Sequence, residues 1–203
     1  MSAGSVIWQS ARNLVDSARN LDALWETIVS ELIGNKYDVR LEENGTENKV
    51  ACSSWTNPVW SMYFNHFASK RRNSRICGSI TITFQLTCDI EDSEIEWKYG
   101  RTAKLIAAYS PRPDDWFLFD IASPDSSGIF TDSVTNGPRW ELTEDPSQWF
   151  FAVPLDSLTS PTAVQRLVVT PLLRMIAGED ARVVFSGLES EICMPPAPEE
   201  PSA

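Results

Sequence analysis

The sequence predicts an α+β fold, in which an antiparallel β-meander sheet is covered by an N-terminal amphipathic helix and by further helices. Three observations lead to this class. Apolar and polar residues alternate over residues 79–88, which is the periodicity of a strand. Apolar residues recur at helical spacing over residues 11–33. The predicted elements also lack the regular strand–helix–strand alternation that a parallel sheet needs.

The centre of the predicted sheet is a meander of three strands. Residues 79–88 and 94–99 are expected to form a hairpin around an acidic four-residue turn. In that register Phe84 faces Tyr99, apolar residues meet apolar residues, and the alternate polar positions form a solvated face. Residues 103–109 supply the third strand, and their apolar side chains on both faces predict a central position.

The N-terminal helix carries a short repeat. The segment S-A-R-N-L occurs twice, seven residues apart, which places Leu14, Leu21 and Ile28 at one heptad position. Two interpretations follow. Such a helix usually packs across its own sheet, and the same positions could instead join two chains as a homo-oligomer.

A second helix is expected at residues 57–67, because Asn57 can cap it and Pro58 suits the first helical position. A run of cations follows it. They would complement the negative C-terminal end of the helix dipole, or else contact an anion. These cations are Lys70, Arg71, Arg72 and Arg75.

The remaining elements are predicted from turn and cap residues. They are a hairpin of residues 37–41 and 49–52 around Asn44-Gly45, strands at 116–122, 139–143, 148–153 and 182–185, a long loop at 123–138, and a helix from 160 to 177. Pro171 should kink or split that last helix, because proline lacks the N–H that a helix needs. We expect one domain over residues 1–188 and a disordered Pro/Glu-rich tail at 189–203.

Charge is distributed unevenly along the chain. Residues 1–112 hold 13 basic and 13 acidic side chains, whereas residues 113–203 hold 4 basic and 15 acidic ones, so the second part carries the whole net charge of −11. An acidic surface repels nucleic acid and attracts basic partners. The N-terminus does not resemble a signal peptide, no apolar run is long enough to span a bilayer, and the four cysteines show no pairing pattern, so a cytoplasmic location is expected.

Sequence signatures of common catalytic sites are missing, and His66 is the only histidine. One constellation suggests metal chemistry. Asp89, Glu96 and Lys98 fall on one face of the predicted hairpin, where two carboxylates could hold Mg²⁺ and a lysine could stabilise a charged phosphorus centre. Glu96-Trp97-Lys98 with a preceding Asp89 resembles the core of PD-(D/E)xK nucleases, although no Pro-Asp precedes it. The resemblance implies a Mg²⁺-dependent nuclease or phosphodiesterase, whereas charged cross-strand pairs on a solvated sheet face explain the same residues without a function.

The leading functional hypothesis is a non-enzymatic protein-binding module, similar in composition to immunity proteins, chaperones and inhibitors. It rests on the acidic C-terminal part, on eight tryptophans and on the missing catalytic groups. The expected docking surface combines the 123–138 loop with aromatic residues assumed to be exposed. Its residues are Trp116, Asp125, Asp132 and Trp140. No cofactor, membrane contact or direct nucleic-acid contact is expected.

Overall fold

The structure, a computed structural model, describes residues 3–47, 59–86, 102–113 and 133–194. Its strands are β1 (Arg40–Glu47), β2 (Val59–Phe67), β3 (Ile76–Gln85), β4 (Lys104–Ser110), β5 (Ser133–Asn136), β6 (Arg139–Leu142) and β7 (Trp149–Pro154). Its helical segments are α1 (Ala3–Ile33), η3 (Leu155–Ser157), α3 (Pro161–Val164), η4 (Gln165–Val169), α4 (Thr170–Ile176) and α5 (Ala181–Val184).

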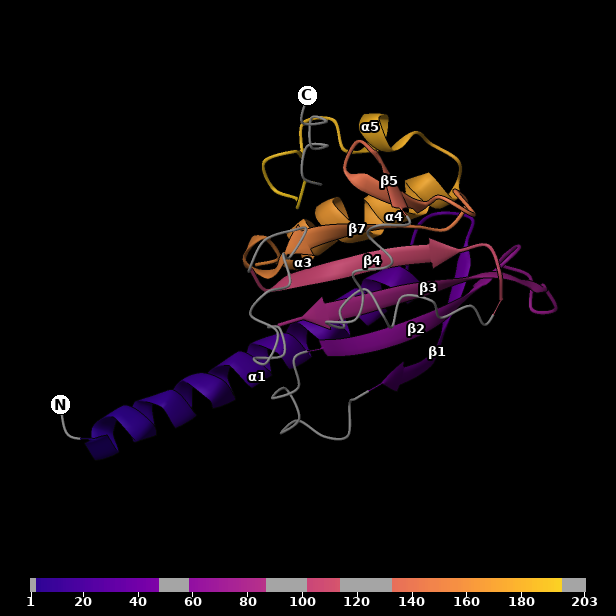
Figure 1. The fold of residues 1–203 in the computed structure, drawn as a ribbon. Coiled ribbons are helices and arrows are strands. Elements are labelled where there is room, and N and C mark those ends of the chain that lie inside the picture. The colour runs from indigo at the N-terminus through magenta and orange to yellow at the C-terminus, as the bar shows by residue number, and fades with distance from the viewer. Residues whose placement is uncertain (1–2, 48–58, 87–101, 114–132, 195–203) are drawn as a thin grey trace, which may run out of the picture.

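The described strands form one antiparallel sheet of seven strands in the order β1-β2-β3-β4-β7-β6-β5 (Figure 1). The first four strands are neighbours in chain order, and the last three add to β4 in reverse order. Strand β4 therefore lies inside the sheet, which confirms the central position predicted for residues 103–109. The fold is α+β with an antiparallel sheet, as the sequence predicts.

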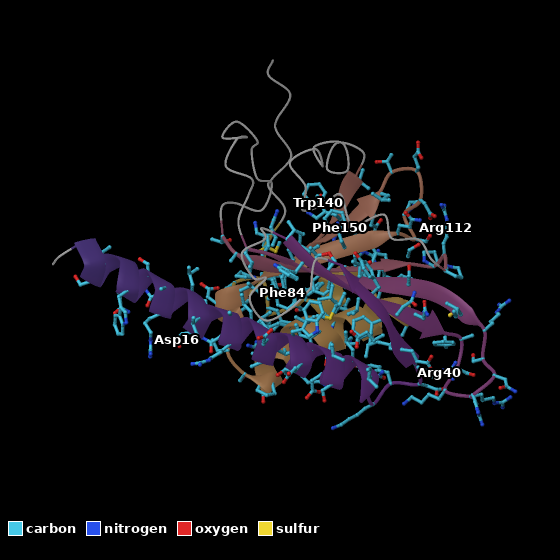
Figure 2. All side chains as sticks on the ribbon, turned by 90° about the horizontal axis from the view of Figure 1, so that it is seen from below. Asp16, Arg40, Phe84, Arg112, Trp140 and Phe150 are labelled. Atoms are coloured by element: carbon cyan, nitrogen blue, oxygen red, sulfur yellow. The ribbon has the colours of Figure 1, made fainter. Side chains whose placement is uncertain are left out.

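One face of the sheet forms the main hydrophobic core. Its side chains align across the strands, because Trp60 pairs with Phe84, Phe84 with Leu105, and Leu105 with Val153. All four are completely buried. Helices α1, α3 and α4 cover this face (Figure 2), and their apolar side chains belong to the same cluster.

The opposite face of the sheet is also buried, contrary to the solvated face that the alternating pattern suggested. Thr81, Thr83 and Gln85 of β3 are only 2–3 % exposed. The hydroxyl oxygens of Ser61 and Thr83 lie 2.8 Å apart and share a hydrogen bond, which compensates for their burial. A smaller hydrophobic cluster lies on this face, formed by Ile106, Ala108, Trp140, Phe150, Ala152 and Cys193.

Residues 59–67 form strand β2, so the prediction of a helix at 57–67 is wrong. Alternate residues Trp60, Met62 and Phe64 are completely buried in the main core, which is a period of two rather than 3.6. The intervening Tyr63 is also buried, and this second apolar face concealed the alternation in the sequence. Pairing with β1 and β3 on both edges decides the conformation.

Long-range pairing also corrects two predicted hairpins. Strand β1 continues through Asn44-Gly45 with a bulge and pairs with β2, where a turn was expected. Phe84 lies between Trp60 and Leu105, so the predicted pairing of Phe84 with Tyr99 is wrong. Residues 49–52, 94–99 and 116–122, which were predicted as strands, lie outside the described residues.

The C-terminal part contains two further corrections. Residues 181–184 form the short helix α5 instead of a strand, because the Asp180 side chain caps it by accepting a hydrogen bond from the Arg182 N–H at 2.9 Å. Ile192 and Cys193, assigned to the disordered tail, are 6 % and 8 % exposed, and the Cys193 N–H donates to the Ala152 carbonyl. These residues therefore belong to the packed body.

The helical region at 161–176 lies where the sequence predicted a helix. A five-residue π-helical segment, η4, separates α3 from α4, and Pro171 stands in the first turn of α4. Proline has no N–H to donate to the preceding turn, and a π-helical segment accommodates that loss. The hydrogen-bonding pattern therefore changes just before Pro171, while the helical conformation continues from 161 to 176, and the expected kink stays a prediction. In the part of the chain that the structure describes, no helix is both long and apolar enough to cross a membrane.

Candidate functional site: a projecting helix and the groove at its base

The second half of α1 packs against the sheet. Trp25, Ile28 and Leu32 are at most 4 % exposed, and all three belong to the main core. The Trp25 ring stacks on Phe84, with the ring centroids 5.7 Å apart and an angle of 22° between the ring planes. The apolar stripe of this half is therefore covered by the protein's own sheet, as the first interpretation of the repeat expected.

The first half of α1, residues 3–20, extends away from the body of the protein, and we call it the arm (Figure 1). Four of its large apolar side chains are exposed, with exposed fractions of 51 % for Val6, 62 % for Trp8, 64 % for Leu14 and 49 % for Val15. Leu14 follows the same heptad register as Leu21 and Ile28 of the packed half. The apolar stripe thus continues beyond the sheet that covers its second half.

Polar contacts within the arm lie outside this stripe. The Gln9 side-chain amide donates a hydrogen bond to the Asn13 side-chain oxygen at 2.9 Å. Arg19 and Asp16 approach to 3.5 Å, one turn apart. Asp16 is labelled on the arm in Figure 2. Such pairs support an exposed helix by a few tenths of a kcal/mol each, so they hold the arm helical without covering its apolar side.

A groove of about 730 Å³ lies where the arm joins the body. Residues 17–27 of α1 form one wall, and the segment around η3 and the start of α3 forms the other. Most of its lining is apolar, and the half-buried Leu21 and Leu24 place this lining beside the apolar stripe of α1. The main apolar residues of the groove are Leu21, Leu24, Leu86, Leu155, Leu158 and Val164. The groove therefore adjoins the end of the heptad stripe at Leu21, one turn beyond Ala18 of the arm.

Charge separates the arm from the rest of the chain. Residues 1–20 contain two arginines and one aspartate, a net charge of +1. The rest of the chain carries −12, and the two together give the net charge of −11. A contact on the arm is therefore not opposed by the acidic charge of the body at close range. The arm therefore combines exposed apolar side chains with a low net charge.

His66, Cys77 and Tyr109 meet at one end of the sheet, where nucleophilic chemistry could be sought. His66 Nδ1 lies 3.5 Å from Cys77 Sγ and 3.4 Å from the Tyr109 hydroxyl oxygen. Burial lowers the pKa of His66, raises the pKa of the Cys77 thiol, and raises the pKa of Tyr109 to about 12. All three groups are therefore neutral near pH 7, whereas a thiol nucleophile needs a lowered pKa. The geometry suits a hydrogen-bonded structural cluster.

The cations at residues 70–75 lie in the connection between β2 and β3, not at the end of a helix, so the proposed helix-dipole role is wrong. Arg40 organises this connection. Its guanidinium lies 3.7 Å from the centre of the Phe67 ring and donates a hydrogen bond to the Arg72 carbonyl at 3.1 Å. Lys70 adds a hydrogen bond from its ammonium group to the Asn35 carbonyl at 3.5 Å. The exposed cations of this connection are Lys70, Arg71, Arg72 and Arg75.

Most residues selected from the sequence as functional lie outside the described residues. This holds for the metal-site candidates Asp89, Glu96 and Lys98, and for the docking candidates Trp116, Asp125 and Asp132. Both hypotheses remain predictions for those positions. Across residues 3–47, 59–86, 102–113 and 133–194, no group of three or more His, Cys, Asp and Glu side chains could hold a metal ion.

Trp140, the remaining docking candidate, is described, and its expected exposure is wrong. It is 5 % exposed and stacks on Phe150 with an angle of 5° between the ring planes. These two residues are cross-strand partners of β6 and β7, which explains the stacking. In contrast, Trp8 was missed, because the helix was expected to begin only at residue 11. The apolar residues 6–8, which continue the helical spacing, were the signal available in the sequence.

Comparisons of the chain with family models, curated proteins and solved structures found no match.

Proposed function

We propose that this chain is a non-enzymatic docking module that binds a protein partner through the arm and the adjoining groove. One observation carries the proposal, namely the apolar stripe of α1 that continues past the sheet and leaves Leu14 64 % exposed; Trp8, 62 % exposed, lies on a neighbouring side of the same arm. Contiguous exposed apolar surface of this kind is typical of interaction sites. Tryptophan is also one of the residue types most often found at binding hot spots.

The gain from covering the arm can be estimated from its exposed side chains. Full burial of an aliphatic side chain gains about 1.5–3 kcal/mol, so covering a half-exposed one gains about 1 kcal/mol. Leu14 and its neighbour Val15 then contribute about 2 kcal/mol per helix, before the cost of association. The groove adds apolar surface to this total.

Toward a different protein with a basic surface, the acidic part of the chain is proposed to act at longer range. Residues 113–203 carry the net charge of −11. If the partner is basic, this charge raises the association rate, and the effect should weaken as salt screens it. An association rate that stays constant between low and moderate salt would argue against a basic partner, while leaving the apolar contact in place. We also propose a cytoplasmic location, supported by the free thiols of Cys77 and Cys193.

The test compares two variants in which the same charge is added at neighbouring positions. Leu14→Asp places a carboxylate in the exposed apolar stripe. Asn13→Asp adds the same charge on the polar side and keeps the oxygen that accepts the hydrogen bond from Gln9. Asn13→Asp should leave the helix content unchanged, because Asn and Asp are comparably poor helix formers, whereas Leu14→Asp lowers the helix propensity by about 0.5 kcal/mol. Circular dichroism therefore has to show that α1 stays helical in Leu14→Asp before the two variants are compared.

Tagged wild-type protein and both variants are then captured from native lysate under identical washes, and the bound proteins are quantified by mass spectrometry. A protein that is retained by the wild type and by Asn13→Asp, but lost with Leu14→Asp, supports docking through the arm. Identical sets of bound proteins for all three would refute the proposal.

A further inference from the structure

We propose that the partner covering the arm is a second copy of this chain, packed antiparallel to the first about a two-fold axis; this inference rests on the docking function proposed above. Each copy would place its arm along the arm of the other and beside the other's groove. The observations that favour this occupant are the charge distribution, the order of small and large residues along the stripe, and the position of the groove.

Charge favours an antiparallel arrangement over a parallel one. Two bodies that each carry about −12 repel when they lie side by side, as parallel arms would require. Antiparallel arms place the bodies at opposite ends of the helix pair. In a pair centred on residue 16, residue 21 of each copy lies opposite residue 11 of the other, so the two bodies begin about 15 Å apart along the helix pair at the rise of an α-helix. This exceeds the Debye length of about 8 Å at physiological salt, so the repulsion is largely screened.

The residues along the stripe are complementary to themselves in the antiparallel direction. The heptad core positions here alternate between small and large residues, as Ala11, Leu14, Ala18 and Leu21. An antiparallel pair centred on residue 16 places Leu14 against Ala18 of the partner subunit. Parallel helices would instead place leucine against leucine and alanine against alanine, which fills space less evenly.

The same register places each groove beside the arm of the other copy. With residue 16 at the centre, residues 17–27 of one copy lie opposite residues 5–15 of the other, and residues 17–27 are those that form the helical wall of the groove. The Leu21 side chain, half-buried in the single chain, then meets Ala11 of the partner subunit. The contact is isologous, so it closes at two copies instead of extending into a filament.

The first experiment is sedimentation velocity on the purified full chain, from about 1 μM to about 100 μM, a range that covers the affinity of a contact of this size. The wild type and Asn13→Asp should become dimeric over this range, with dissociation constants within about threefold of each other. Leu14→Asp should weaken dimerisation by about 100-fold, because a carboxylate would be buried in the centre of the contact.

A second measurement tests the direction of packing by disulfide formation under mild oxidation, with wild type as the control for the native cysteines. Chains carrying Ala11→Cys are mixed with chains carrying Leu21→Cys. The antiparallel register predicts a linked pair only in the mixture, identified as the peptide joining positions 11 and 21. If Ala11→Cys chains link to one another instead, the packing is parallel and the proposed arrangement is wrong.

The outcomes separate this inference from the docking proposal. A wild-type chain that stays monomeric at 100 μM overturns the second copy as partner, while a different protein lost from Leu14→Asp in the capture experiment would still support docking. A dimer that Leu14→Asp leaves intact shows that two copies associate elsewhere, and it also overturns the inference. If the variants behave alike in both experiments, both proposals fail.

Discussion

Two tryptophans on the same helix should differ sharply in their effect on stability when each is replaced by alanine. Trp25 is 4 % exposed and stacks on Phe84, whereas Trp8 is 62 % exposed on the arm. The neighbours of the two rings also differ. On the arm, the Arg12 guanidinium lies 5.6 Å from the centre of the Trp8 ring. The pair therefore tests the division of α1 into a covered half and an exposed half.

The magnitudes follow from burial. Trp25→Ala removes a large side chain from the core and should lower the free energy of unfolding by about 3–5 kcal/mol. Loss of the ring pair with Phe84 accounts for about 1 kcal/mol of this. Trp8→Ala removes a mostly hydrated ring and an exposed cation–π contact, so it should cost less than about 1 kcal/mol in the isolated chain.

Urea denaturation followed by circular dichroism measures both changes. With an m-value of about 2.5 kcal/mol per molar urea, a loss of 4 kcal/mol moves the midpoint by about 1.6 M. At about 1 μM protein, Trp8→Ala should move it by less than about 0.4 M. If a second copy covers Trp8, its effect should grow at about 100 μM, because association stabilises the folded chain by mass action. Equal costs for Trp8 and Trp25 at low concentration would refute the proposed exposure of the arm.

Three further predictions concern the body of the protein. Gly78→Ala should lower the free energy of unfolding by about 1–3 kcal/mol in urea titration, because its Cβ would lie 2.6 Å from the Ser110 carbonyl oxygen, and unchanged stability would contradict this. Hydrogen bonds from Ser147 lower the pKa of Asp145, and the Arg112 guanidinium at 2.6 Å lowers it further. The ionised Asp145 carboxylate therefore stabilises the fold above its unfolded pKa near 4, and this contribution is lost as pH falls through the lower folded pKa. Asp145→Asn should therefore be less stable than the wild type at pH 7, with a difference that shrinks in acid; a difference independent of pH would be the contrary result. Burial raises the pKa of Cys193 from 9.0 to about 11. The neutral thiol therefore stabilises the fold below pH 9, and this contribution is lost as pH rises through 11. Cys193→Ala should reduce the fall in the free energy of unfolding at alkaline pH, and an unchanged slope would exclude the thiol as its cause.

The sequence was most informative where the residue pattern within one segment is enough to predict its conformation and position. Residues 103–109 have apolar side chains on both faces, and the strand they form is central. Residues 57–67 were misassigned for a related reason. Their apolar side chains satisfy both a helix and a strand buried on two faces, and only pairing with β1 and β3 selects the strand.

The candidate site could be predicted only in part. The heptad spacing of Leu14, Leu21 and Ile28 was visible in the sequence, and it allowed either packing on the sheet or contact with another chain. The structure divides these positions, because Ile28 is completely buried and Leu14 is 64 % exposed. Trp140 shows the converse, since a tryptophan beside a polar loop was expected on the surface and instead stacks on its cross-strand neighbour Phe150.

By itself, the sequence determined the α+β class, the amphipathic stripe of α1 and the helical region around Pro171, because each depends on residues close together in the chain. The tertiary structure alone decided that β7 lies beside β4, that both faces of the sheet are buried, and that the sheet ends before the stripe of α1 does. Hydrophobic periodicity shows which side of an element avoids water. What covers that side depends on contacts between residues far apart in the chain, which a local pattern does not encode.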